Sequence, residues 1–263
     1  MLRWFFLLDD MVVGLGIVAA VVGFAMLLSW LFVWSPWRKS LRACFIEDRD
    51  LTMLLSLLFS LTIGFLSAEI ESRNDAAAST VGVEANALQT LAYILSASPP
   101  AAEALRLPAT KYLNAVLQHE FSGDRQLIAT STGSRLMNEL FASAIKYSNA
   151  HATTDVASRT VVELAIRASE ARSRRLALMQ SGVNELKWFL VAFLLLALQV
   201  SVVLVTADNL RKMLTVLFLV SLAGGFTVAA AAVQEDPFTP PRMVSSAPME
   251  LALKAFTSPP QSN

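Results

Sequence analysis

The sequence predicts an all-α membrane protein: four transmembrane helices with a helical-bundle soluble domain inserted between the second and the third. Its 263 residues are 55% hydrophobic, which is too apolar for an ordinary soluble protein. The apolar residues are concentrated in four long stretches. Between the second and third stretches lies the segment 69–187, in which charges return and apolar residues recur at helical spacing, with no strand pattern.

Residues 1–68 are predicted to form the first transmembrane hairpin, with spans at 11–34 and 51–68. Span 11–34 contains no charged residue and is long enough to cross a bilayer at about 1.5 Å per residue. It is too long for a secretory signal peptide, and its basic residues follow it instead of preceding it, so we expect it to be retained. Span 51–68 is near the lower limit of length for crossing.

The stretch 51–95 organises the chain, because it begins as the second span and continues without a proline into the soluble segment. The first helix-breaking pair is Pro99-Pro100. We expect one long helix, or two stacked helices, that leaves the bilayer and becomes the first helix of the soluble domain. The apolar face predicted for its soluble part contains Val81, Ala85, Leu88, Leu91, Ala92 and Leu95.

The rest of the soluble domain is predicted to be a short helical piece followed by three helices. Pro99-Pro100 and Pro108 bracket the short piece, and Pro108 is expected to begin the first helix, because proline is favoured in a first turn. Ser122-Gly-Asp124 should end this helix, and Ser131–Ser134 and 153–155 supply N-cap residues for the other two. The side chains expected to face the core are Leu113, Val116, Leu117 and Phe121, followed by Leu136, Leu140, Phe141 and Ile145.

Residues 188–233 are predicted to form the second transmembrane hairpin, with spans at 188–206 and 213–233. The Pro-rich tail, 234–263, contains a short amphipathic helix at 248–256, whose apolar stripe consists of Met249, Ala252, Leu253 and Phe256. This helix could lie on the membrane or dock on the bundle, and we favour docking. The last six residues are expected to be disordered.

Four spans place the soluble domain and both termini on one side of the membrane. The two short loops on the other side contain six Lys and Arg residues, against three in the terminal segments. The positive-inside rule then puts the short loops in the cytoplasm. A basic cluster near the end of the soluble domain, Arg172, Arg174, Arg175 and Lys187, opposes this assignment. We expect a multi-pass protein of the inner (plasma) membrane with an extracytoplasmic soluble domain.

Several short motifs occur in a distinctive order. They are Gly64-Phe65, Arg73-x-Asp75, Glu84-Ala-x-Ala-Leu88, Glu170-Ala-Arg-x-Arg-Arg-Leu176, Asn209-Leu-Arg211 and Pro237-Phe238. In this order and spacing the chain resembles the bacterial bestrophin-like domain membrane proteins, a family of unknown function. It departs from their pattern in having Asp236 where a basic residue is expected.

The resemblance implies a more distant likeness to bestrophin channels. Those channels are pentamers with four spans, a hydrophobic neck lined by the second span, and a cytosolic helical domain. The likeness therefore implies a homo-oligomer, and it implies the opposite sidedness to that indicated by the basic residues of the loops.

No Asp, Glu, Lys, Arg or His lies within the four spans. This argues against a proton-coupled carrier, since such carriers place ionisable groups at membrane depth. It is compatible with a pore gated by an apolar constriction, and equally with no transport at all. If the second span lines a pore, Leu58, Leu61 and Phe65 are candidates for an apolar ring, with Ser60, Gly64 and Ser67 as a small polar face. The alternative is that these residues only pack in a bundle.

A second candidate site is a network of charges near the membrane exit. Its candidate members are Glu69, Arg73, Asp75, Glu84, Arg172, Arg174 and Arg175. The acidic residues could form a charged vestibule, or they could pair with the arginines of the returning helix. Glu84, beside an apolar stripe, is either a buried partner of Arg167 or exposed.

Other functions are disfavoured by composition. A single cysteine, Cys44, excludes an internal disulfide, and two histidines are too few for a histidine metal cluster. His119-Glu120 is expected to lie on a solvated face. We expect no cofactor, no metal, no enzymatic activity and, with zero net charge, no nucleic-acid partner. The hypotheses are an oligomeric channel for small ions, or a membrane-anchored helical sensor or scaffold without transport.

Overall fold

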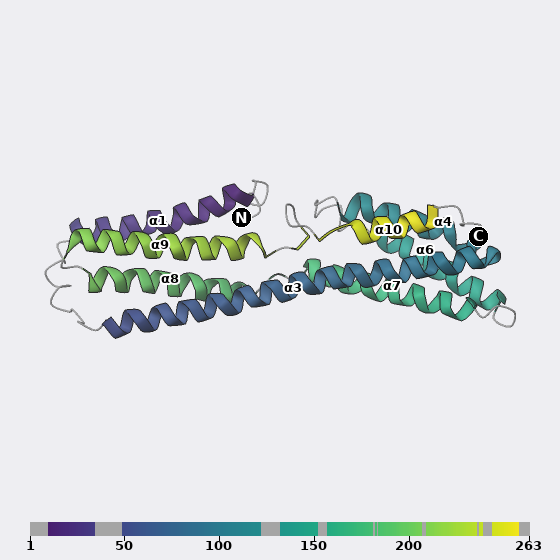
Figure 1. Cartoon of the computed structure of the whole chain (residues 1–263), viewed down its shortest axis with the longest axis horizontal. Helices are drawn as coiled ribbons and strands as arrows, with labels where there is room; N and C mark the ends of the chain where they lie inside the picture. Colours follow the sequence, from purple (N-terminus) through teal and green to yellow (C-terminus); the bar gives the residue numbers. More distant parts are fainter. Residues whose placement is uncertain are drawn as a thin grey trace. The chain divides into compact units, whose positions relative to one another are not determined.

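The computed structural model describes residues 10–34, 49–121, 132–151, 157–180, 182, 184–206, 209–235, 237–238 and 244–257, and the regular structure in these ranges is helical without strands (Figure 1). The helices are α1 (Asp10–Trp34), α3 (Arg49–Ala97), α4 (Pro99–Ala115), the π-helical η2 (Val116–Glu120), α6 (Thr132–His151), α7 (Ala157–Gln180), α8 (Glu185–Val205), α9 (Leu210–Val233) and α10 (Ala247–Thr257). The predicted all-α class is therefore confirmed.

Four stretches contain described helix that is long and apolar enough to cross a membrane. They are Val12–Trp34, Asp50–Ala97, Ser158–Val205 and Leu210–Val233. The third stretch takes in α7 as well as α8, and the apolar span predicted at 188–206 coincides with α8 except for its last residue. Each of the four spans expected from the sequence thus overlaps one of these stretches and extends at most one residue beyond it.

α3 is one continuous helix, which decides between the two forms that the sequence left open. Its hydroxyl residues bond back within the helix, as Thr62 Oγ1 does to Leu58 O at 2.7 Å and Thr80 Oγ1 to Ala76 O at 2.6 Å. The helix ends where Ser98 turns extended, with φ −128° and ψ 94°, before Pro99-Pro100. A residue before proline is restricted to such a conformation, and the two prolines then begin α4, where a missing N–H costs nothing.

The chain divides into two compact units. Unit 1 comprises Met1–Ser72 and Gly182–Glu235, and unit 2 comprises Arg73–Ser181 and Asp236–Asn263. α3 contributes its first part to unit 1 and its second part to unit 2.

In unit 1, glycines allow α1, α8 and α9 to approach closely. A Cβ on Gly225 of α9 would lie 3.3 Å from Val18 Cα of α1, and one on Gly224 would lie 2.6 Å from Leu195 Cδ1 of α8. Small residues of this kind let helices pack by dispersion where lipid removes the hydrophobic driving force. α3 packs on α8 through a separate apolar cluster that contains Phe59, Ile63, Leu66, Ile70, Val191, Leu194, Leu195 and Leu198.

Unit 2 has one core, formed by α3, α4, α6, α7 and α10. The apolar face predicted for α3 is buried, with Val81 at 0% and Leu88, Leu91 and Leu95 at 1% exposure. Met249, Ala252 and Phe256 of α10 belong to the same core, and Gln89 Nε2 donates to Pro248 O at 3.3 Å. The tail helix therefore docks on the bundle, as the stripe pattern favoured.

Two expectations about helix boundaries and apolar faces in unit 2 are wrong. Pro108 lies inside α4 and does not begin a helix. Its neighbours on the buried face, Leu105 and Ala109, are 0% exposed, so packing compensates for the backbone hydrogen bond that proline cannot donate. Ile145 is 38% exposed instead of facing the core. The buried stripe of α6 continues through Ala144 and Tyr147 instead.

Some expectations concern residues outside the described ranges. They are the helix break at 122–124, Ser131 as a cap, the caps at 153–155 and the disorder of 258–263.

Candidate functional site

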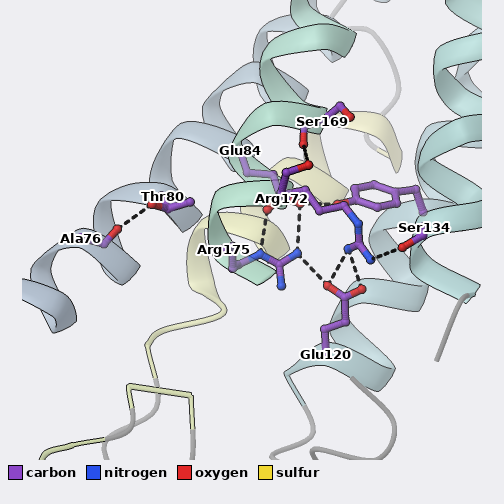
Figure 2. A network of polar contacts seen from close by, with 10 residues as sticks. Ala76, Thr80, Glu84, Glu120, Ser134, Ser169, Arg172 and Arg175 are labelled. Carbon is purple, nitrogen blue, oxygen red and sulfur yellow. Dashed lines mark hydrogen bonds and ion pairs between the residues drawn. The ribbon is translucent and has the colours of Figure 1, made fainter. Parts of the chain in front are cut away.

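A network of charged side chains lies in the interior of unit 2 and joins α3, η2 and α7 (Figure 2). Arg175 donates to both carboxylate oxygens of Glu84, from Nε to Oε2 at 2.8 Å and from Nη2 to Oε1 at 3.2 Å. Arg175 Nη2 also lies 2.7 Å from Glu120 Oε2. Arg172 Nη1 donates to both Glu120 oxygens at 2.6 and 2.7 Å. We call Glu84, Glu120, Arg172 and Arg175 the ion network; each is at most 4% exposed, so two carboxylates balance two guanidinium groups away from water.

Tyr112 of α4 binds the carboxylate of Glu84 from another side. Its hydroxyl donates to Glu84 Oε1, and the guanidinium of Arg172 lies over its ring, 5.6 Å from the centroid. Burial first, and the Glu84 carboxylate second, raise the pKa of Tyr112 well above its ordinary value. The hydroxyl therefore keeps its proton and remains a donor. Burial alone would lower the pKa of Arg175, but Glu84 and Tyr112 beside it raise that pKa above its ordinary value.

Two local features bring Glu120 to the arginines. The chain leaves α4 through η2, whose last turn is closed by the Phe121 N–H donating to Val116 O at 3.2 Å. On the other side, Gly133 in the first turn of α6 provides the space that the carboxylate occupies. A Cβ on Gly133 would overlap Glu120 Oε1 and lie 2.7 Å from Arg172 Nη2. Glu120 thus contacts a helix N-terminus, where the helix dipole favours a negative charge.

The ion network is built to hold helices together. Each carboxylate is already engaged by a guanidinium group, and the described residues contain no group of three His, Cys, Asp or Glu side chains that could hold a metal ion. Removing one partner from such a buried set leaves an uncompensated charge, which costs several kcal/mol. The network therefore fixes how α3, η2 and α7 pack within unit 2.

The structure brings only part of the predicted charge network together. Glu84, Arg172 and Arg175 meet in the ion network, whereas Arg174 is exposed and lines two surface grooves with Glu170. Arg167 bonds Glu163 at 2.6 Å, so the pairing of Glu84 with Arg167 is not formed.

The remaining candidates, Glu69, Arg73 and Asp75, lie in α3 on both sides of the boundary between the two units. Glu69 pairs with Lys187 inside unit 1. Within unit 2, Arg73 Nη2 donates to Leu178 O at 3.5 Å, and Asp75 is exposed. These residues are not part of the ion network.

Sequence reasoning missed Tyr112 and Glu120, and it placed Glu120 on a solvated face. A signal for both was present. Glu120 follows Leu113 by seven residues and Val116 by four, so it shares their helical face. Tyr112 lies three residues after the buried Ala109. A carboxylate on an apolar stripe, like Glu84 on α3, indicates a buried partner for an arginine.

All six candidate pore residues lie outside the buried face of α3. Leu58, Leu61 and Phe65 are 41%, 54% and 68% exposed, and Ser60, Gly64 and Ser67 are exposed as well. The face that packs on α8 consists of Phe59, Ile63, Leu66 and Ile70, each at most 7% exposed. The candidates are thus available on the surface of the single chain.

Comparison with solved structures shows the same fold in other membrane proteins. A bacterial bestrophin homologue from Klebsiella pneumoniae superposes with a TM-score of 0.71 at 14% identity, covering 92% of this chain and 96% of that one. A crystal structure described as a membrane protein superposes with a TM-score of 0.71 at 13% identity, covering 92% and 97%. No curated protein sequence matches this chain significantly.

The family assignment comes from the sequence model of the bestrophin-like domain, which matches residues 50–249. This match takes in α3 from its second residue, the ion network, α8, α9 and the start of α10, and it bears out the resemblance noted in the motifs. The chain belongs to the bestrophin-like domain family.

Proposed function

We propose that the protein assembles as a homo-oligomer in the membrane and conducts small ions along a path lined by α3. The observation that supports this most is that α3 has two different faces within unit 1. One face is buried on α8, while Leu58, Leu61 and Phe65, with the small polar Ser60 and Gly64, remain exposed. Several copies that turn this face toward a common axis would enclose an uncharged path.

The exposed face suits a pore that is closed while its apolar constriction is dry and open once water enters it. Leu58, Leu61 and Phe65 offer an apolar constriction, and such a constriction gates by excluding water. Ser60, Gly64 and Ser67 offer small polar positions beside it. Because the span contains no ionisable side chain, it provides no proton relay, and selectivity would come from the width and wetting of the path.

Phe65→Ala tests this proposal in reconstituted bilayers. Removing the ring should ease wetting and raise the conductance over a range of anions and cations. Phe226→Ala is the matched control, because Phe226 of α9 is 62% exposed and lies on another helix. It should leave the conductance at the wild-type value. If folded Phe65→Ala and wild type both carry no current, conduction is refuted, and a sensor or scaffold without transport becomes the leading hypothesis.

We further propose that the soluble domain, residues 69–187, is inserted between the second and third spans and lies outside the bilayer, on the extracytoplasmic side of the inner membrane. The excess of basic residues in the short loops supports this sidedness. A cysteine placed at Ser122, in a Cys44→Ser background, should react with an impermeant thiol reagent in intact cells. Labelling only after lysis would reverse the sidedness and agree with the cytosolic domain of bestrophin channels.

A further inference from the structure

α8 contains two buried polar side chains that reach different neighbours within unit 1. Gln199 is 0% exposed, and its Nε2 donates to Ser221 Oγ of α9 at 3.0 Å and to Val21 O of α1 at 3.4 Å. Ser201 is 4% exposed, and its hydroxyl shares a hydrogen bond of 2.6 Å with Thr52 Oγ1 of α3. We call Gln199 and Ser201 the α8 polar pair. The two residues lie about 3 Å apart along the helix axis.

Through the α8 polar pair, hydrogen bonds join all four membrane helices. Gln199 connects α8 to α9 and α1, and Ser201 connects α8 to α3. Polar side chains at membrane depth form interhelical bonds because lipid offers them no alternative partner. The bond between Ser201 and Thr52 fixes the start of α3 against a helix that is itself fixed on its other side.

α3 needs such a constraint because its apolar residues surround the helix. Leu54, Leu57, Leu58 and Leu61 are 41–63% exposed, yet they are as apolar as Phe59 and Ile63, which pack on α8. In lipid the hydrophobic effect does not distinguish these faces, since acyl chains solvate leucine as well as a helix does. Apolar composition therefore does not choose one rotation of the helix. Polar contacts do: Thr52 at the start of this stretch, and Glu69, which pairs with Lys187 of α8, at its end. Thr52 precedes Phe59 by seven residues and so lies on the same face.

We propose that the α8 polar pair sets the rotation of α3, so that Thr52 and Ser201 are positioning residues for the face that carries Ser60, Gly64 and Ser67. The rotation itself follows from the hydrogen bonds, and only the consequence for conduction rests on the proposed function. Without the bond, among the described residues only the part-exposed pair of Glu69 and Lys187, at the other end of this stretch, would hold α3 to α8 by a polar contact. The first turns of α3 would then populate several rotations, and the constriction formed by Leu61 and Phe65 would no longer be unique.

Thr52 and Ser201 are better probes than Gln199. Gln199 Oε1 accepts no hydrogen bond from the described residues, so Gln199→Leu removes an unsatisfied acceptor together with two favourable bonds. Its two effects on stability oppose each other. Thr52→Val removes only the hydroxyl and keeps the shape, and Thr52→Ser restores the hydroxyl.

The test is a nitroxide scan of Ser56–Ile63 in a Cys44→Ser background, reading collision with oxygen in lipid vesicles. In wild type the oxygen accessibility should vary with the helical period and be lowest at Phe59 and Ile63. Thr52→Val should lower the ratio of the native rotation to the other rotations about threefold, the factor that corresponds to an average interhelical hydrogen bond in a membrane, and so reduce the amplitude of this variation. Thr52→Ser should restore it. An unchanged amplitude in folded Thr52→Val overturns the proposal.

A double substitution separates a shared bond from two unrelated effects. Ser201→Ala should give the same loss of amplitude, and Thr52→Val with Ser201→Ala together should lose no more than either alone. Additive losses would overturn the shared role. Should Thr52→Val lose its helical circular dichroism, Ser201→Ala carries the test. The scan needs no current, so silent bilayers with the expected loss of amplitude would refute conduction and leave the positioning role standing.

Discussion

The interiors of the two units are built from different polar chemistry. The buried polar side chains of unit 2 include two glutamates and two arginines paired at 2.6 to 3.2 Å. Among the described residues of unit 1, those that are buried and polar are neutral: Ser29, Gln199, Ser201 and Ser221. α3 belongs to both units, with a charge-free stretch in unit 1 and Glu84 in the core of unit 2.

The difference shows what each environment tolerates. A buried charge is stable only where partners and hydrogen bonds replace its water, which the two arginines of α7 and Tyr112 of α4 provide for Glu84 and Glu120. A helix in lipid meets the same cost without such partners on its outer face, so hydroxyl and amide groups take over the interhelical contacts. The predictions below test whether this contrast in chemistry is also a contrast in energy.

The largest effect is expected from breaking the ion network. Arg175→Leu leaves Glu84 without its guanidinium partner and Glu120 with one partner fewer, and should lower the free energy of unfolding by about 3–5 kcal/mol. Thermal or denaturant unfolding in mild detergent measures it. Arg167→Leu is the control, because its pair with Glu163 is 63% and 60% exposed; it should cost at most about 1 kcal/mol. Equal effects of the two substitutions would mean that the network contributes no more than a surface pair.

Tyr112→Phe should cost about 1.5–3 kcal/mol, the range for a hydrogen bond to a charged group. The raised pKa of Tyr112 sets the pH dependence. A group whose pKa is higher in the folded state stabilises fully below its unfolded pKa, here about 10, and loses this contribution as the pH rises through the folded value. The difference in stability between wild type and Tyr112→Phe should therefore be constant up to about pH 10 and shrink above it. A difference that shrinks between pH 7 and 9 would contradict the assigned donor.

Gly133 and Gly82 differ in the space around them: a Cβ at Gly133 would meet Glu120 and Arg172, whereas one at Gly82 would meet nothing. Gly133→Ala should destabilise unit 2 by about 1–3 kcal/mol, because the new methyl group would displace Glu120 and Arg172. Gly82→Ala on α3 meets nothing within 4 Å and should stabilise by about 0.4–1 kcal/mol, since alanine loses less backbone entropy in a helix. The two unfolding midpoints should move in opposite directions. If both substitutions lowered the unfolding midpoint, the effect at Gly133 could not be assigned to the space that the Glu120 carboxylate needs.

The smallest effect is expected in unit 1. Ser221→Ala removes the acceptor of Gln199 Nε2 at 3.0 Å and should cost only about 0.6 kcal/mol, the average for interhelical bonds in a membrane. Unfolding of reconstituted protein monitored by helical circular dichroism gives the value. A loss as large as that of Arg175→Leu would remove the energetic contrast between the two interiors.

The sequence predicts elements better than it predicts partners. Apolar periodicity located the buried face of α3 and the docking stripe of α10, because burial of one face is a local property of a helix. The prediction that Pro108 begins a helix is wrong, because the packing of the buried Leu105 and Ala109 outweighs the local preference of proline for a first turn.

The pairing of charges depends on contacts between distant segments. Glu84 and Arg175 are 91 residues apart in the chain, and no spacing rule connects them. Spacing rules apply only within one helix, as for the exposed i,i+4 pair of Glu163 and Arg167. In unit 1 the sequence was searched only for ionisable residues, so Gln199 was missed. A glutamine in an apolar span is itself a sign of a buried hydrogen bond.

The most direct measurement is the mass of the protein purified in mild detergent, by light scattering combined with chemical cross-linking. The proposed path along α3 requires a closed ring, because one or two copies leave the exposed face of Leu58, Leu61 and Phe65 open to lipid. A single homo-oligomer of more than two copies is predicted, with unchanged mass in Phe226→Ala. A folded monomer or dimer as the main species would contradict the shared path.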